Sequence, residues 1–154
     1  MGNIKQSFFA GLFSIITIGI LTLLTYKTEY GVFLIASVGS SMVLLYGYRE
    51  CPFAQPKYVF FGHVLTAAVG MFFLYFVPLP LFLVIPLAVG FGVGLMILFN
   101  VTHPPAGGNP IIVIMGSVSV DYILTPVISG SIIIIIFAII INKLILKKNY
   151  PSKK

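Results

Sequence analysis

The sequence predicts an all-α membrane protein with about six transmembrane segments. Of its 154 residues, 59% are hydrophobic and only 8% are charged, whereas soluble domains carry roughly 25% charged residues. The mean hydropathy is +1.13. Because one span takes roughly 20 apolar residues, the chain has room for about six short spans and little else. We therefore expect a single transmembrane domain over residues 1–154.

Six apolar stretches follow one another along the chain, and turn-forming residues separate them. The first stretch is longer than the apolar core of a signal peptide, and no small-residue cleavage site follows it, so we interpret it as a span. Five of the stretches are long, and the sixth, Gly107–Val120, is shorter. The long ones are Phe8–Thr25, Val32–Tyr48, Tyr58–Val77, Leu81–Val101 and Tyr122–Asn142.

Charge placement favours six crossings with both termini in the cytoplasm. Lysine and arginine are retained on the cytoplasmic side of a membrane, and in this topology only Lys27 lies outside. If the second and fifth stretches were re-entrant, Arg49 and Lys57 would also lie outside. We therefore expect a plasma (inner) membrane protein, and residues 143–154 as its basic cytoplasmic tail. The lysines of that tail are Lys143, Lys147, Lys148, Lys153 and Lys154.

The second and fifth segments resemble each other, and both are interrupted. Each has two glycines eight residues apart, then a proline and a further glycine. Each half of the chain is thus a long span, a broken span and a long span. With three crossings per half, the second half is inverted, as in many transporters whose broken helices carry the binding site at mid-membrane. The sequence predicts two inverted three-segment repeats, about 8–77 and 81–142. The matching residues are Gly39, Gly47, Pro56 and Gly62, and Gly108, Gly116, Pro126 and Gly130.

The polar stretch from Thr102 to Pro110 predicts irregular backbone at membrane depth. Such backbone is tolerated only where it is buried in protein or lines a wet cavity. Because its prolines disfavour regular helix, we expect extended chain up to Gly107 and a half-helix over Gly108–Gly116. Pro110 suits the first turn of that helix, and Asn109 is its expected cap.

The first broken span follows the same logic. We expect Gly31–Val38 to be partly extended and a half-helix to open at Gly39. Free N–H groups and the positive end of the macrodipole make two facing helix starts an anion site. Neither junction contains Asp or Glu, which favours a small inorganic anion over a cation. The predicted binding residues are Gly39, Ser40, Ser41, Thr102, His103, Gly107, Gly108 and Asn109.

The residues Thr102-His103-Pro104-Pro105-Ala106-Gly107 resemble the signature of the HPP family of membrane proteins. Gly39–Leu45, Ala54-Gln55-Pro56 and Gly62-His63 resemble the upstream motif of that family. The resemblance covers roughly residues 36–130. It implies transport, and since some cyanobacterial and chloroplast members are described as nitrite transporters, it implies nitrite as the anion.

Two segments depart from the family pattern. Gly108-Asn109-Pro110 stands where many members carry Ala followed by Thr or Asn. Arg49-Glu50-Cys51 stands where many members have an acidic residue followed by Ser. If Asn109 contacts the substrate, the first departure alters selectivity.

Several motif residues have both a functional and a structural interpretation. Gln55 either gates the cytoplasmic side or braces a loop, and His63 either functions in transport or packs with a hydrogen bond. His103 donates to the anion, relays a proton or caps a backbone carbonyl. Arg49 either forms a solvated pair with its acidic neighbour or attracts anions. The residues assigned to a gate or to structure are Gln55, Pro56, His63, Pro104 and Pro105.

Besides transport, the sequence leaves two other function classes, a membrane subunit and an enzyme. A small structural or regulatory membrane subunit is the alternative, and it would co-purify with a partner and give no flux. We expect no enzyme and no metal or other cofactor, because the sequence has no paired carboxylates and its two histidines fall short of a zinc site. Since the positive charge flanks the last span, we expect no nucleic-acid partner. The partners expected are the anion, the lipid bilayer and, through glycine-rich helix faces, further copies of the chain.

Overall fold

The computed structural model describes residues 3–29 and 32–152, and all regular structure in those two ranges is helical. Four of the helices are long and apolar enough to cross a membrane. They are α1 (Ile4–Lys27), α3 (Pro56–Phe76), α4 (Leu81–Leu98) and the helical run Val120–Ile145, whose central part is α6 (Ser129–Ile139). This last run is kinked at Thr125, whose backbone angles are not helical (φ −131°, ψ 118°). The two shorter helices are α2 (Ala36–Met42), which continues as a π-helix over Val43–Gly47, and α5 (Asn109–Gly116). The predicted all-helical membrane fold is confirmed.

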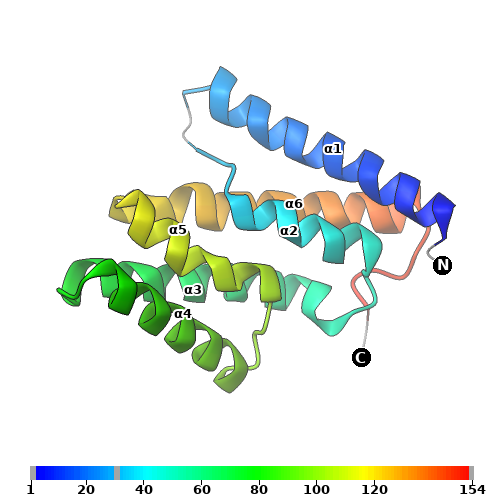
Figure 1. The fold of residues 1–154 in the computed structure, drawn as a ribbon. Helices are drawn as coiled ribbons and strands as arrows, with labels where there is room; N and C mark the ends of the chain where they lie inside the picture. The colour runs from blue at the N-terminus through cyan, green and yellow to red at the C-terminus, as the bar shows by residue number, and fades with distance from the viewer. Residues whose placement is uncertain (1–2, 30–31, 153–154) are drawn as a thin grey trace.

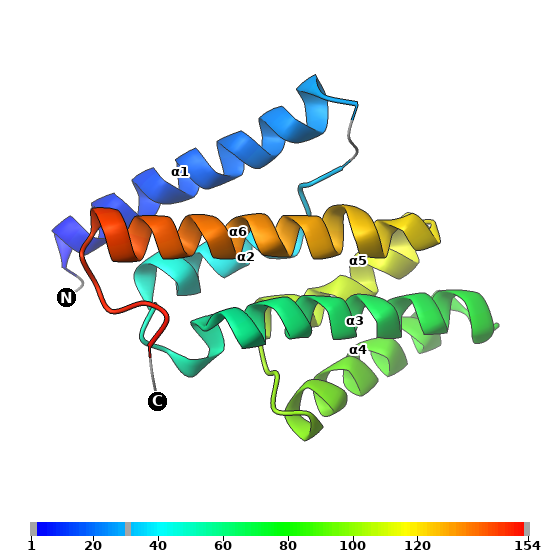
Figure 2. The same cartoon turned by 180° about the vertical axis from the view of Figure 1, so that it is seen from behind.

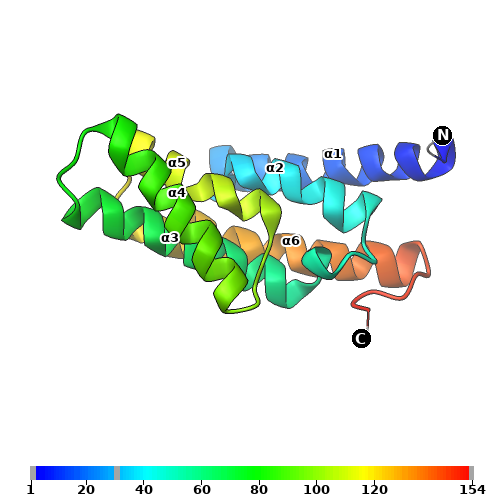
Figure 3. The same cartoon turned by 60° about the horizontal axis from the view of Figure 1, so that its bottom comes forward.

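The two shorter helices lie between the long ones and start near the middle of the bundle (Figure 1). The first residues of α2 and α5 lie side by side in both views, and from there the two helices run in opposite directions (Figures 1 and 2). The start of α1 and the end of the helix that contains α6 lie at the same end of the molecule. Figure 3 shows α4 lying across α3 and α5. The starts of α2 and α5 are therefore enclosed by longer helices.

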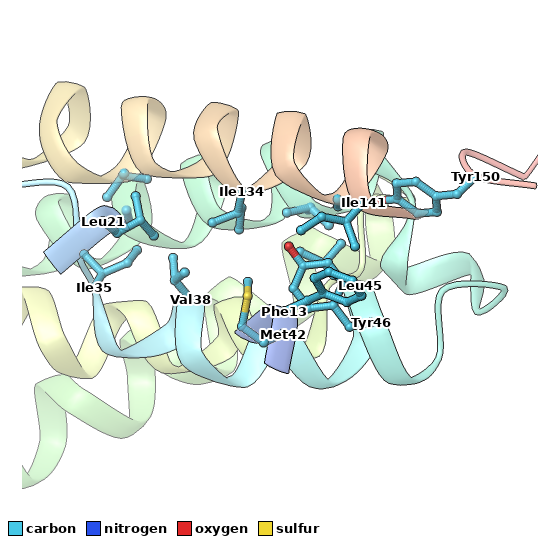
Figure 4. Packing of buried hydrophobic residues seen from close by; sticks show 14 of the residues in the cluster. Phe13, Leu21, Ile35, Val38, Met42, Leu45, Tyr46, Ile134, Ile141 and Tyr150 are labelled. Carbon is cyan, nitrogen blue, oxygen red and sulfur yellow. The ribbon is translucent and has the colours of Figure 1, made fainter. Parts of the chain in front are cut away.

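The largest apolar cluster packs α1, α2 and α6 together (Figure 4). Leu21 from α1, Val38 from α2 and Ile134 from α6 are fully buried in it. By contrast, Ile15 and Phe82 point outward and are 72% and 76% exposed. Apolar side chains on the outer face suit a surface that contacts lipid, where close packing rather than water exclusion holds the helices together.

Both broken segments are present, but their helices begin at other residues than predicted. The first begins at Ala36, not at Gly39, because the backbone stays extended only as far as Ile35 (φ −125°, ψ 148°). Gly31 lies outside the described residues. Pro104–Gly108 is a 3₁₀ helix and not extended chain. Its prolines occupy the first two positions, where a helix needs no N–H donor.

The predicted cap of the second half-helix was also wrong. Gly108 precedes α5, and Asn109 has helical backbone angles (φ −60°, ψ −41°). No side chain caps this helix start. The Asn109 side chain is therefore free to bond with residues of other helices.

The predicted basic tail is partly folded. Lys143 belongs to the last helix, which ends at Ile145. Beyond it the chain turns back, and the Tyr150 hydroxyl donates a hydrogen bond of 2.8 Å to the Ala54 carbonyl. Tyr150 is only 2% exposed, and this burial raises the pKa of its hydroxyl, which stays a donor. Lys153 and Lys154 lie outside the described residues.

Gly130 allows α6 to approach the extended chain before α2. A Cβ atom at Gly130 would lie 2.7 Å from the Phe33 carbonyl oxygen. We expect Gly130→Ala to lower the free energy of unfolding by about 1–3 kcal/mol, because backbone must move to make room. Thermal unfolding in detergent measures this. Gly90→Ala is the control, since a Cβ there meets no atom within 4 Å. Equal melting temperatures for the two variants would contradict the close contact.

Candidate functional site

Six buried polar side chains form one cluster where the starts of α2 and α5 meet. Two come from α2, two from α3, one from the residue before the 3₁₀ helix, and one from the first position of α5. Each is at most 4% exposed, although the surrounding chain is strongly apolar. The members of this polar cluster are Ser37, Ser41, His63, Thr66, His103 and Asn109.

Helical spacing and one glycine bring these side chains together. Ser37 and Ser41 are one turn apart on α2, and His63 and Thr66 share a face of α3 in the same way. Gly62 lets α3 approach His103, since a Cβ there would lie 2.7 Å from the His103 Cβ. The backbone of α3, from the first half of the chain, therefore packs directly against the segment around His103, from the second half.

The side chain of Asn109 contacts three other members of the polar cluster. Its Nδ2 lies 3.1 Å from His63 Nδ1, 3.1 Å from the His63 carbonyl oxygen and 3.0 Å from Thr66 Oγ1. Its Oδ1 accepts a hydrogen bond of 2.6 Å from the Ser37 hydroxyl. Because a carbonyl oxygen only accepts, the amide nitrogen must face the His63 carbonyl. The amide thus joins α2, α3 and α5.

Ser41 bridges the two histidines. Its Oγ lies 2.8 Å from His103 Nε2 and 3.1 Å from His63 Nε2. The other nitrogen of His103, Nδ1, lies 2.8 Å from the Phe53 carbonyl oxygen and must carry the proton that this oxygen accepts. In a neutral ring Nε2 then accepts from the Ser41 hydroxyl, and Ser41 Oγ accepts from His63.

One assignment of the protons satisfies these contacts. Asn109 donates to His63 Nδ1, His63 donates to Ser41, Ser41 donates to His103, and His103 donates to the Phe53 carbonyl. In this assignment the single Ser41 hydroxyl proton goes to His103 and not to the Ser37 carbonyl oxygen, which lies 3.1 Å from Ser41 Oγ. The two rings are 5.0 Å apart between centroids. The cluster contains no carboxylate, and in this assignment both rings are neutral imidazoles that need no counter-ion.

Four of the residues singled out from the sequence belong to the polar cluster: Ser41, His63, His103 and Asn109. The others lie elsewhere. Gly39 and Ser40 are exposed, and Gly107 and Gly108 are half-buried beside the cluster. Thr102 donates to the Met96 carbonyl near the end of α4. Pro56 begins α3, and Pro104 and Pro105 begin the 3₁₀ helix.

Sequence reasoning missed Ser37 and Thr66. Ser37 stands four residues before Ser41, and Thr66 stands three residues after His63. Residues at these spacings share a helix face. A search for polar residues one helical turn away from Ser41 and His63 would have found both.

The start of α5 contributes its side chain more than free N–H groups. The Asn109 N–H is bonded to the Ala106 carbonyl, and Pro110 has no N–H. The donors expected from the second helix start are therefore taken or missing. An anion in this cluster would meet hydroxyl, amide and imidazole donors instead.

Gln55 ties the loop over residues 49–55 to the tail. Its Nε2 donates to the Arg49 and Cys51 carbonyls at 2.8 and 3.2 Å, and its Oε1 accepts from the Ser152 N–H at 2.8 Å. These bonds match the loop-bracing interpretation. The same loop holds the Phe53 carbonyl that His103 contacts, so tail, loop and polar cluster are joined.

We expect Gly62→Ala to destabilise the fold at the polar cluster. The new Cβ would also lie 3.1 Å from the Val101 carbonyl oxygen, so backbone as well as His103 must move. The expected loss is about 1–3 kcal/mol of unfolding free energy, measured by thermal unfolding in detergent. Gly94→Ala, where a Cβ meets nothing within 4 Å, serves as the control. An unchanged melting temperature for Gly62→Ala would refute the contact.

Over the two described ranges, no three His, Cys, Asp or Glu side chains gather as they would around a metal ion. Both histidines of the polar cluster are instead bonded to Ser41.

Comparison with known proteins identifies relatives along nearly the whole chain. The family model described as "HPP, transmembrane region" matches residues 1–151. One transmembrane protein of Dictyostelium discoideum is 32% identical over 125 residues, which are 77% of this chain and 44% of the relative. Another from the same organism is 30% identical over 159 residues, covering 97% of this chain and 51% of the relative. The chain thus spans about half the length of these curated relatives. No solved structure matches it.

Proposed function

This chain belongs to the HPP family of transmembrane proteins, and on that premise we propose that it transports a small inorganic anion across the membrane. The observation that supports the proposal is the polar cluster: six buried polar side chains without a carboxylate, inside an apolar bundle. Polar groups at membrane depth are costly and mark substrate pathways. Nitrite, the anion implied by the sequence resemblance, is our first candidate substrate.

The chemistry of the polar cluster suits an anion better than a cation. The hydroxyls of Ser37 and Ser41, the amide of Asn109 and the imidazole N–H groups are donors that can turn toward acceptor oxygens. A cation would need oxygen ligands, and carboxylates in particular are missing. An anion such as nitrite would replace bonds that these donors now make with one another.

We further propose that residues 8–77 and 81–142 are inverted repeats. The support is the arrangement in Figures 1 and 2, where each half contributes two long helices and one short helix that starts in mid-bundle. In this proposal both termini are cytoplasmic and the membrane is the plasma (inner) membrane, as the lysine distribution favours. The site lies within one chain, so each protomer of a homo-oligomer would carry its own.

The loop over residues 49–55 is the gate in this proposal. The polar cluster is closed, with no member more than 4% exposed, so transport requires a rearrangement. His103 bonds to the loop through the Phe53 carbonyl, and Gln55 and the Ala54 carbonyl hold the tail. Release of tail and loop would free His103 and open a path to one side.

We propose that the chain is not an enzyme, although one contact resembles part of a catalytic site. Ser41 Oγ and His103 Nε2 are as close as a serine nucleophile and its base, at 2.8 Å. Ser41 is nevertheless fully buried and also bonded to His63, which blocks access of a substrate carbonyl. Covalent labelling of Ser41 by a fluorophosphonate probe would contradict this.

A flux panel in proteoliposomes tests the proposed function. Purified protein is reconstituted and offered nitrite, nitrate, formate, bicarbonate, chloride and fluoride. We expect flux of at least one of these anions above that of empty liposomes, with nitrite first. Absence of flux for all six, together with a stably co-purifying partner, would favour the structural subunit instead.

A further inference from the structure

We propose that a second site, at the end of the bundle where α1 begins, binds the phosphate group of an anionic lipid. This site shares no residue with the polar cluster. A cavity of about 480 Å³ opens there between α1, the loop after α2 and the segment after α6. The lining residues that matter for its chemistry are Lys5, Phe9, Tyr46, Arg49, Leu146 and Lys148.

Three cations converge on this cavity from three distant parts of the chain. Lys5 comes from α1, Arg49 from the loop after α2, and Lys148 from the segment after α6. None of the lining residues is acidic. Glu50 lines only the adjoining cavity of about 270 Å³. The positive charge of these three side chains thus favours an anionic ligand in the cavity.

Arg49 brings a guanidinium to this cavity. Its Nε is buried and makes no hydrogen bond, so a ligand in the cavity contacts other atoms of the Arg49 side chain. Phosphate oxygens are acceptors that a guanidinium binds with two parallel bonds.

The apolar part of the cavity favours a lipid over free phosphate. Phe9, Tyr46 and Leu146 line it together with the cations. Next to Lys5 and Phe9 on the same helix, Ile4 and Phe8 are 86% and 65% exposed. An acyl chain can therefore run along α1 while its phosphate contacts the cations. Basic pockets between transmembrane helices bind anionic headgroups in this manner.

The test compares lipids on the delipidated protein in detergent. Phosphatidylglycerol, phosphatidylcholine with the same acyl chains, and inorganic phosphate are titrated separately, with bound lipid counted by native mass spectrometry. We expect phosphatidylglycerol to bind at least about tenfold more tightly than phosphatidylcholine. No preference between the two lipids would overturn the proposal. Inorganic phosphate that displaces the lipid at millimolar concentration would overturn the lipid assignment.

A matched pair of variants locates the site. The double variant Lys5→Gln, Lys148→Gln should lose the preference for phosphatidylglycerol to within about twofold. The control Lys57→Gln, Lys143→Gln removes the same charge from residues that do not line the cavity, and it should keep the preference. Both should melt like the wild type without added lipid. An equal loss in the control would mean that only net charge matters and would overturn the site.

Discussion

Replacing Asn109 with alanine is expected to reduce anion flux at least about tenfold and to destabilise the protein. The change removes an amide that contacts three other members of the polar cluster, so the Ser37 hydroxyl, the His63 carbonyl and His63 Nδ1 lose a partner. Unsatisfied buried polar groups cost about 1–3 kcal/mol each, and partners within a bilayer relieve part of that. We expect a total loss of about 2–3 kcal/mol. Flux in proteoliposomes, normalised to folded protein, and thermal unfolding in detergent measure the two effects.

Asn142 offers a matched control for Asn109. Its buried amide donates to the Leu45 and Ala138 carbonyls, both at 2.9 Å, and lies outside the polar cluster. Asn142→Ala should lose stability to a similar degree and retain flux per folded molecule. If both variants lost flux equally, the polar cluster would have no special role.

The isosteric variant Asn109→Asp separates charge from shape. A carboxylate keeps the size of the amide but repels an anion and loses the two N–H donors. We expect flux to fall as far as in the alanine variant. Wild-type anion flux in Asn109→Asp would rule out an anion at this residue.

Replacing Ser41 with alanine is the second substitution with a large expected effect. It removes the hydroxyl between His63 and His103, which lies 3.1 and 2.8 Å from their Nε2 atoms. Two imidazole nitrogens then face each other without a bridge, and we expect about 1–2 kcal/mol of lost stability. Flux in proteoliposomes should fall at least about tenfold, because the cluster loses both a donor and the positions of its rings.

The neighbouring residue is the control for Ser41. Ser40 is exposed and outside the polar cluster, so Ser40→Ala should keep wild-type flux and stability. This outcome differs from the expectation based on sequence alone, which placed both serines at the anion. A Ser40→Ala variant as defective as Ser41→Ala would restore that earlier assignment.

The difference between Ser40 and Ser41 shows where sequence reasoning reaches its limit. On a soluble helix, the alternation of polar and apolar residues tells which face is buried. In a bilayer, lipid and protein interior are both apolar, and α2 has apolar or small residues on every side. Only the tertiary contacts of Ser41 with two histidines, 22 and 62 residues away, distinguish it from its neighbour.

His103 and Asn109 were identified from the sequence for a different reason. Prolines and glycines interrupt an apolar chain there, and an interruption at membrane depth needs an explanation. The local conformation was less predictable, because two prolines allow either extended chain or the first turn of a 3₁₀ helix. The docked tail was missed because lysine content alone indicates a free cytoplasmic flank, and Tyr150 among those lysines has no neighbour in sequence that predicts its burial.

The polar cluster imposes an order on the assembly of the protein during synthesis. His63 is synthesised 46 residues before Asn109. Until Asn109 follows, the His63 imidazole lacks this partner, and lipid offers no replacement. Tyr150 lies 96 residues after Ala54 and reaches this acceptor only after all the helices between them have been synthesised. The hydrogen bonds of the first half are therefore completed only by residues of the second half, and neither half reaches its final hydrogen bonding alone.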